Sequence, residues 1–243
     1  MKGYTNEKNF INEINNKKYK EINILLQEFI KAIFPSIKNN DIIQAQKYGY
    51  YAKTDIIIEV NNIKKGISIK SGSKNSVHIE PINKFVKFLN NLEYKEIDKF
   101  LAYIYSDGTI NNTGKNRIST EEYIKYHLND LLIINKEFEK IKEKIIIRSL
   151  IKTDVNYKVT VDAFILGEPN DFLWATKEEV INYLQNISNE SKSAHISNLY
   201  IQNWNKNIIQ NPKYEHCRNY IQIKWYSMFD DFIKIMQKRI HKV

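Results

Sequence analysis

The sequence is poor in the residues that mark special structural classes. Its 243 residues include one cysteine, four prolines and seven glycines. A single cysteine excludes an internal disulfide framework, and Cys217 with its neighbour His216 provides fewer than the three or four ligands of a zinc site. The low proline and glycine content argues against a long low-complexity linker. We therefore expect a folded protein in a reducing compartment, the cytoplasm.

Long apolar runs are also missing. The opening sequence MKGYTNEKNF lacks the apolar segment of a signal peptide, and no stretch of about 18 consecutive apolar residues occurs anywhere in the chain. These absences predict no membrane partner. The chain is long enough for one large domain, or for a catalytic core with an appended lobe.

Acidic residues are in the minority. Asp and Glu number 28 against 37 Lys and Arg, which gives a formal charge of +9 at pH 7. The excess gathers late in the chain, because residues 191–243 hold nine basic and three acidic residues, a net +6. A composition rich in Ile, Asn, Lys and Tyr, as an AT-rich genome produces, also raises the lysine count. The uneven distribution nevertheless fits a polyanionic partner such as DNA.

Hydrophobic spacing predicts alternating helices and strands over positions 1–108. Apolar residues three and four positions apart indicate one or two amphipathic helices, and short β-branched segments indicate strands. The expected elements are helices within 6–33 ended by Pro35, strands at 53–60 and 65–72, a helix opened by Pro81, and a strand at 100–108. The order is helix, strand, strand, helix, strand.

The remaining sequence predicts a second group of elements. Two capping boxes, Ser119–Glu122 and Thr176–Glu179, place helix starts near residues 120 and 177. Further strands are expected at 159–167, 199–204 and 220–225, and a closing helix at 227–240. The polar run 106–119 is typical of a loop. We therefore expect a core at 1–108 and a recognition and dimerisation lobe at 109–243, packed on the core or continuous with it.

The two strands at 53–60 and 65–72 predict a hairpin that brings an acid and a lysine together. If Asn61–Lys64 form a four-residue turn, Val60 faces Lys65 and Asp55 lies directly opposite Lys70. Directly opposed side chains have Cβ atoms about 5 Å apart, and Ser68 shares the face of Lys70. An ion pair among isoleucines is costly unless it is hydrogen-bonded or useful.

Thr54-Asp55, Ser68-Ile69-Lys70 and the element order together resemble the PD-(D/E)XK nuclease superfamily. This resemblance implies a restriction-endonuclease-like αββαβ core, with a mixed sheet flanked by helices, followed here by a C-terminal α/β lobe. The chain departs from the pattern at Ser68, where the family has Glu or Asp. Some restriction endonucleases of the superfamily carry Ser-x-Lys and take the missing carboxylate from the following helix, a role that Glu80 can fill.

The resemblance also implies a magnesium site. Mg²⁺ takes oxygen ligands at about 2.1 Å and usually keeps waters, so Asp55, Glu80 and the carbonyl of Ile69 are its expected ligands. Lys70 is expected to position the attacking water or to stabilise the charge that develops on phosphorus. Acids of the first helical region remain open as alternatives to Glu80: Glu13, Glu21 and Glu28.

Residues of the basic tail are the expected DNA contacts. Amide and guanidinium side chains are the types that read adenine and guanine edges. The candidates are Gln202, Asn203, Asn205, Lys206 and Arg218. A rival catalytic motif, Asp162 with Gln222-Ile223-Lys224, also stays open, although its two parts lie far apart in the sequence with a helix between them.

Together with the basic tail, the resemblance implies a magnesium-dependent endonuclease that cleaves double-stranded DNA at specific sequences. The expected protein is a type II restriction enzyme of a restriction-modification system that acts as a homodimer, because two-fold DNA sites mirror protein symmetry. A Holliday-junction resolvase or repair nuclease is the alternative within the fold. In a different class, the chain is a non-catalytic DNA-binding protein on a decayed nuclease fold, with Ser68 as the sign of decay.

Overall fold

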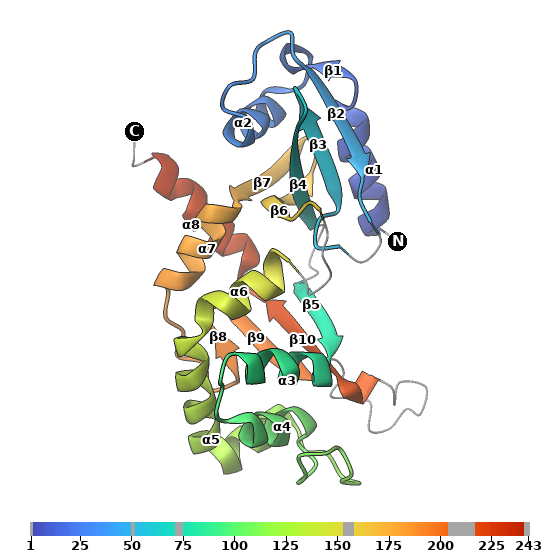
Figure 1. The fold of residues 1–243 in the computed structure, drawn as a ribbon. Helices are drawn as coiled ribbons and strands as arrows, with labels where there is room; N and C mark the ends of the chain where they lie inside the picture. The colour runs from blue at the N-terminus through green and yellow to red at the C-terminus, as the bar shows by residue number, and fades with distance from the viewer. Residues whose placement is uncertain (1, 50–51, 71–74, 153–157, 204–216, 241–243) are drawn as a thin grey trace. The chain divides into compact units, whose positions relative to one another are not determined.

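The chain contains runs of helices and runs of strands, and the strands form two separate sheets (Figure 1). The computed structural model describes residues 2–49, 52–70, 75–152, 158–203 and 217–240. The strand order is β1-β2-β3-β4-β6-β7 in one sheet and β5-β10-β9-β8 in the other. The protein is therefore of mixed α/β class, as expected. None of the helices in the described part of the chain is long and apolar enough to cross a membrane.

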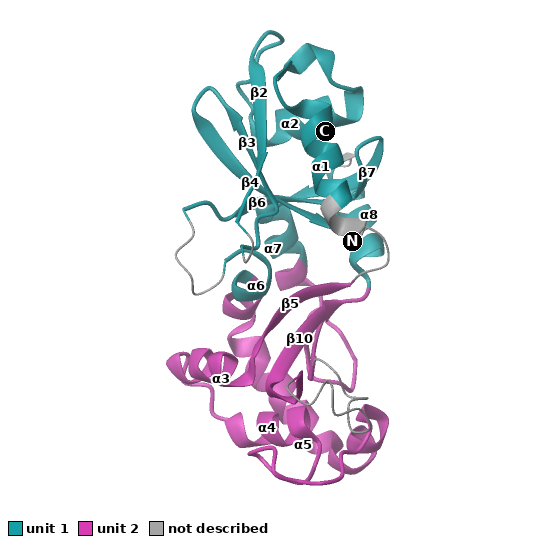
Figure 2. Ribbon diagram, turned by 90° about the vertical axis from the view of Figure 1, so that its right-hand side faces the viewer, with its two compact units in different colours: residues 1–74, 147–183, 227–243 teal, residues 75–146, 184–226 magenta. Residues whose placement is uncertain are grey.

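The chain forms two compact units, each assembled from separate stretches of sequence (Figure 2). Unit 1 comprises residues 1–74, 147–183 and 227–243, and unit 2 comprises 75–146 and 184–226. The expected division after residue 108 does not coincide with these units. The reason is strand pairing over long sequence distances, because β4 pairs with β6 in unit 1 and β5 pairs with β10 in unit 2.

The six-stranded sheet organises unit 1. Strands β2, β3 and β4 form an antiparallel meander, and β6 continues the sheet parallel to β4. Its strands are β1 (Lys17–Lys18), β2 (Ile42–Lys47), β3 (Ile56–Val60), β4 (Ile63–Lys70), β6 (Val161–Glu168) and β7 (Asp171–Thr176). Helices α1 (Lys2–Ile14) and α2 (Ile24–Ile33), separated by the short 3-10 helix η1 (Tyr19–Glu21), precede the meander.

The expected amphipathic helices within 6–33 are confirmed as α1 and α2. Asn23 caps α2 by accepting a hydrogen bond from the Leu26 amide at 2.9 Å, and the helix ends at Ile33, shortly before Pro35. Apolar side chains of both helices share one buried cluster with Ile56 and Ile67. Each fully buried side chain of this size contributes about 1.5–3 kcal/mol, so this layer fixes which face of the hairpin turns inward.

The hairpin of β3 and β4 is confirmed, but the expected four-residue turn is wrong. Val60 pairs with Ile63, so only Asn61 and Asn62 form the turn, with φ values of 50° and 65°. Positive φ at both positions defines a type I′ turn, which matches the twist of a hairpin and is favoured by asparagine. The shorter turn shifts the register by two, and Asp55, which directly precedes β3, lies beside Ser68 where Lys70 was expected.

Unit 2 is built on the four-stranded sheet and helices α3 (Ile82–Asn91), α4 (Ile97–Tyr105) and α5 (Thr120–Lys140). Its strands are β5 (Ser76–Pro81), β8 (His195–Ile196), β9 (Leu199–Asn203) and β10 (Tyr220–Trp225). The strand expected at 100–108 is wrong, because these residues belong mainly to α4. Phe100, Tyr103 and Ile104 are all buried, and their spacing of three and four positions matches one face of a helix.

Most other expected elements are confirmed. Helix α5 begins after Ser119, and α7 (Lys177–Asn186) begins after Thr176, whose hydroxyl and amide both bond to Glu179. Strands β6, β9 and β10 and the closing helix α8 (Met228–Ile240) lie where they were expected. Strands β1, β2, β5, β7 and β8 and helix α6 (Lys142–Leu150) were not expected.

Candidate active site

One oxygen of Asp55 lies beside three polar groups from the end of β4. Its Oδ2 lies 2.6 Å from the Ile69 amide nitrogen and 3.2 Å from the Ser68 hydroxyl, and both groups donate to it. Asp55 precedes β3, where its own amide donates to the carbonyl of Ile67 at 2.8 Å. The hairpin register therefore fixes the carboxylate, and Ser68 takes part by hydrogen bonding instead of carrying a charge.

Lys70 is the third group of this cluster. Its Nζ lies 3.9 Å from Asp55 Oδ2, and the two side chains are 27% and 22% exposed. The expected meeting of acid and lysine is thus confirmed, although the two residues reach each other diagonally across the hairpin. Because both side chains are only partly buried, the pair is accessible to a ligand from solvent.

The described contacts of the Asp55 carboxylate are all made through one of its two oxygens. Among the described residues, every hydrogen bond and ion pair of its side chain goes to Oδ2, which leaves Oδ1 without a partner there. A carboxylate held through one oxygen can present the other to a cation. Mg²⁺ is often held by one or two carboxylates together with waters and substrate phosphates.

Glu80, the expected second carboxylate, lies in a different part of the fold. It belongs to β5 of unit 2 instead of opening a helix, and α3 begins two positions later at Ile82. Its side chain is 7% exposed, and Oε1 lies 2.7 Å from Nε2 of His78. Burial with a polar partner satisfies this carboxylate inside unit 2, and its assignment as a ligand stays a prediction.

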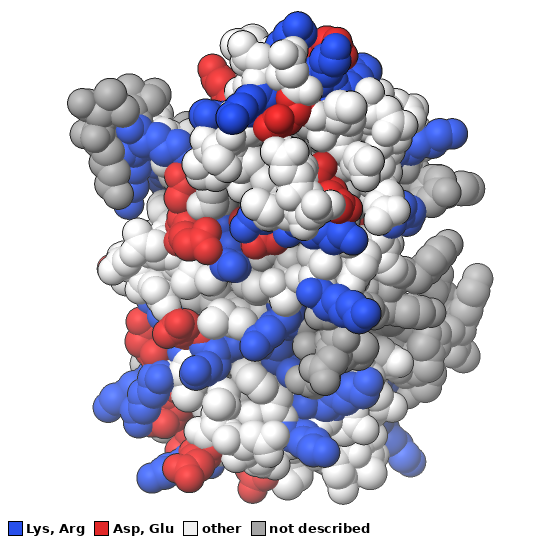
Figure 3. Space-filling view, turned by 45° about the horizontal axis from the view of Figure 1, so that its top comes forward, with Lys and Arg blue, Asp and Glu red and all other residues white. Residues whose placement is uncertain are grey.

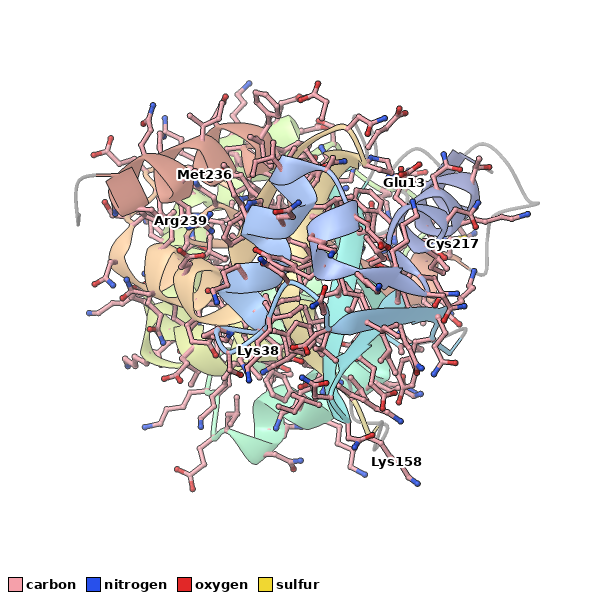
Figure 4. All side chains as sticks on the ribbon, turned by 90° about the horizontal axis from the view of Figure 1, so that it is seen from above. Glu13, Lys38, Lys158, Cys217, Met236 and Arg239 are labelled. Carbon is pink, nitrogen blue, oxygen red and sulfur yellow. The ribbon has the colours of Figure 1, made fainter. Side chains whose placement is uncertain are left out.

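The acids expected as alternatives in the first helical region differ in their surroundings. Glu13, labelled in Figure 4, is 46% exposed and forms an ion pair with Lys17 at 3.5 Å. Glu21 accepts a hydrogen bond from the Lys18 amide at 3.0 Å, and Glu28 is exposed on α2. These positions leave all three without a described contact to Asp55.

Sequence reasoning missed Glu7, the acid of α1 with the clearest link to the hairpin. Its Oε2 lies 2.9 Å from Nζ of Lys47, and Lys47 pairs with Ile56, the residue after Asp55. Glu7 is 18% exposed. It precedes the buried Phe10 by three positions, a spacing that places both on one helical face and was a usable signal.

No group of three or more His, Cys, Asp or Glu side chains suited to a metal ion occurs among the residues that the structure describes. The local donor set in unit 1 consists of the Asp55 carboxylate and the Ile69 carbonyl, with Ser68 and Lys70 beside them. This set fits a magnesium ion that takes its remaining ligands from water and a phosphate.

The rival motif is divided between the units. Asp162 lies in β6 of unit 1 and Lys224 in β10 of unit 2. Asp162 accepts a hydrogen bond from the Gly66 amide at 2.9 Å and lies 3.5 Å from Lys65 Nζ and 4.0 Å from Lys177 Nζ. These contacts occupy both of its oxygens, and they give Asp162 a role in joining β6 to β4.

The residues expected to contact DNA have different environments. Asn203 is fully buried and donates to the carbonyl of Arg218 at 2.9 Å, so its amide is not available at the surface. Arg218 forms a 3.2 Å ion pair with Asp107, whose side chain is fully buried. Gln202 is half-buried, and its amide donates to Gln222 at 3.4 Å. Asn205 and Lys206 lie outside the described residues.

On the face drawn in Figure 3, Lys and Arg side chains are interspersed with Asp and Glu. Cys217 is buried in unit 2 and makes no disulfide. Comparison of the sequence with models of known protein families gives no match, and no curated protein shows significant similarity to it.

Proposed function

We propose that the protein is a magnesium-dependent DNA endonuclease of the PD-(D/E)XK type, with Asp55, Ser68 and Lys70 at its active site. The observation that carries the proposal is the cluster around Asp55 Oδ2. The carboxylate is held by Ser68 and the Ile69 amide, with the Lys70 ammonium 3.9 Å away, and its other oxygen has no described partner. An ion pair at the surface does not by itself require a carboxylate that is held by two further hydrogen bonds.

The strand order of unit 1 supports the same class. Helices precede the β2-β3-β4 meander, and α6 leads toward β6, which is parallel to β4. This order agrees with the αββαβ core that the sequence resemblance implies, except that the meander has one additional strand. The last helix and strand are α6 and β6 instead of segments within 81–108, and the unit 2 residues 75–146, which include the first half of α6, interrupt the core after β4.

The residues of the cluster have complementary roles in this proposal. Asp55 Oδ1 and the Ile69 carbonyl would hold Mg²⁺, and the bound ion supplies the positive charge that polarises a phosphate and acidifies water. Ser68 and the Ile69 amide hold the carboxylate through Oδ2, which fixes the orientation of Oδ1. Lys70, whose only ion pair within the described residues is with Asp55, stabilises the negative charge that develops on the phosphate during attack by water. Glu80 and Glu7 are candidates for a second acidic ligand.

Unit 2 would contribute DNA recognition in this proposal. Of the +6 net charge of residues 191–243, +4 falls on residues 191–226, which belong to unit 2, and lysine and arginine contacts to phosphates provide most non-specific affinity. We further propose double-stranded DNA as the substrate, cleavage at specific sequences as by type II restriction enzymes, and a homodimer as the active form.

Incubation of the purified protein with plasmid DNA of mixed sequence tests the activity. We expect cleavage with Mg²⁺ and none with EDTA, and sequencing of the ends should show a recurrent site. A resolvase would instead cut branched junctions and leave linear duplexes intact. Stable, salt-sensitive DNA binding with no cleavage under any divalent metal would contradict the proposal and favour a non-catalytic DNA-binding protein.

A further inference from the structure

A polar hollow of about 390 Å³ lies in unit 1 beside the strand that follows Asp55. It is lined by the exposed faces of β2 and β3 and by the end of α1. Gln46 pairs with Ile57 and Gln44 with Glu59 across the two strands, so each pair shares one face of the sheet. Asp55 directly precedes β3, so the hollow lies along the strand that follows the candidate active site.

The fold leaves this hollow open because β1 is very short. Its pairing with β2 ends at Ile43, and the next free amide of that edge, Ala45, donates to Oδ1 of Asn15 at 2.9 Å. Asn16 follows with φ of 58°, a left-handed conformation that asparagine tolerates, and its amide donates to the Ile43 carbonyl. The chain thus turns beside β2 without covering Gln44 and Gln46, which are exposed.

The hollow is rich in hydrogen-bonding groups. Within the described residues, the side-chain amides of Gln44, Gln46 and Asn16 make no hydrogen bond. Glu59 adds a carboxylate, which is 24% exposed and lies 3.5 Å from Lys64 Nζ. Amides and a carboxylate suit a ligand that presents both donors and acceptors, whereas the carboxylate repels a phosphate.

We propose that this hollow reads base edges of the DNA duplex, adenine through Gln44 and Gln46 and cytosine through Glu59. The inference rests on the proposed nuclease function of the Asp55 site. A glutamine amide can pair with adenine N6 and N7, and a glutamate accepts from cytosine N4. The spacing also fits, because at about 3.4 Å per residue Ile57 and Glu59 follow Asp55, the residue before β3, by about 7 Å and about 13 Å of chain. At about 3.4 Å per nucleotide, the hollow lies two to four nucleotides from the cleaved phosphate.

The preferred sequences are selected by binding from a library of random DNA duplexes. All variants are made in the Lys70→Ala protein, called the parent, so that the DNA stays intact in Mg²⁺. We expect the double substitution Gln44→Ala, Gln46→Ala to lose preference at one or two adjacent base pairs by about 5- to 150-fold while preferences elsewhere remain. The control Gln237→Ala changes the same exposed residue type on α8, outside the hollow, and should select the parent site. Gln46→Glu should exchange a preferred A·T pair for one that presents cytosine, a change that misfolding cannot produce.

Three outcomes overturn the inference: an unchanged selected site in the double variant, a uniform loss of affinity with a shallower salt dependence, or no DNA binding by the parent. The uniform loss would assign the hollow to backbone contacts. Cleavage by the unsubstituted protein is measured separately. If the unsubstituted protein cleaves DNA and the double variant selects the parent sequence, only the role of the hollow in base recognition is refuted. If the double variant selects a different sequence and the unsubstituted protein does not cleave, only the proposed nuclease activity is refuted.

Discussion

Lys70 Nζ lies 3.9 Å from Asp55 Oδ2, although Ser68, two positions earlier on β4, is the residue that the shortened hairpin turn brings beside Asp55. The Ser68 hydroxyl donates to the same oxygen at 3.2 Å. A serine can stand at the acidic position of the triplet because its hydroxyl orients Asp55 instead of adding a ligand. A second carboxylate ligand for the metal ion would then have to come from elsewhere in the fold.

Asp55→Asn is expected to raise the Mg²⁺ concentration needed for half-maximal cleavage by at least about tenfold, because a hard cation loses its charged ligand. The same titration on Glu80→Gln and Glu7→Gln identifies the second ligand. Whichever variant shifts in the same direction as Asp55→Asn supplies it. If neither shifts, the ion is held by one carboxylate together with water and phosphate. A normal titration for Asp55→Asn would remove it from the site.

Arg218→Gln is expected to destabilise unit 2 instead of acting mainly on DNA. Arg218 pairs with the fully buried Asp107 and also donates to the Gly114 carbonyl at 3.4 Å, so its loss leaves a buried charge with fewer partners. Breaking such a pair costs about 3 kcal/mol. Thermal unfolding and limited proteolysis within 106–119 measure the effect.

Lys192→Gln is the control for Arg218→Gln. Lys192 is an exposed lysine of the same unit, so its substitution should leave the melting temperature unchanged. A full loss of DNA affinity in Arg218→Gln with unaltered stability would instead support a direct DNA contact.

The ion pair of Glu179 and Arg239 predicts a pH-dependent stability of unit 1. Arg239, labelled in Figure 4, bonds to both carboxylate oxygens of Glu179 at 2.5 Å and lies over the Trp174 ring at 3.6 Å. Burial raises the pKa of Glu179, but the hydrogen bonds from Arg239 and Thr176 outweigh it and lower the pKa below 4.5. A lowered pKa adds stability above the unfolded-state pKa, and this contribution is lost as the pH falls through the folded-state value.

Glu179→Gln is therefore expected to lower the free energy of unfolding by about 1 kcal/mol at pH 7, since the pair is partly exposed. The difference from the unsubstituted protein should be smaller at about pH 3, because protonation of the carboxylate in the folded protein removes the charge of the pair. Urea denaturation at the two pH values measures it. Glu178→Gln, at a neighbouring side chain that is 74% exposed, should change neither value. An equal difference at both pH values would show that the ion pair is not its source.

The hairpin and its acid were predictable from the sequence because they depend on local patterns. The β-branched isoleucines, the Asn-rich turn and the positions of Asp55 and Lys70 all lie within one short segment, and the register error of two arose only from the turn type. Capping boxes located α5 and α7 for the same reason, since the interactions that start a helix are made within one turn.

Pairing between distant segments could not be read from the sequence. Strand β5 is short and carries His78 and Glu80, and it becomes a strand because β10, from near the other end of the chain, pairs with it. The segment 100–108 contains aromatic and β-branched residues, which are typical of strands. Its buried positions nevertheless have helical spacing, and their burial in unit 2 stabilises the helix α4. The carboxylate predicted to complete the site, Glu80, was placed by the assumption that positions 1–108 form one core.

Plasmid cleavage by Lys70→Ala, measured beside Lys64→Ala and Lys224→Ala, tests the central claim most directly. Lys64 is a matched control, because it lies on the same strand and forms an ion pair with Glu59 at 3.5 Å. The account predicts that Lys70→Ala binds DNA but cleaves it at least about 100-fold more slowly, whereas the other two variants cleave at the unsubstituted rate. Normal cleavage by Lys70→Ala, or its loss in Lys224→Ala alone, would contradict the assignment of the active site to Asp55 and Lys70.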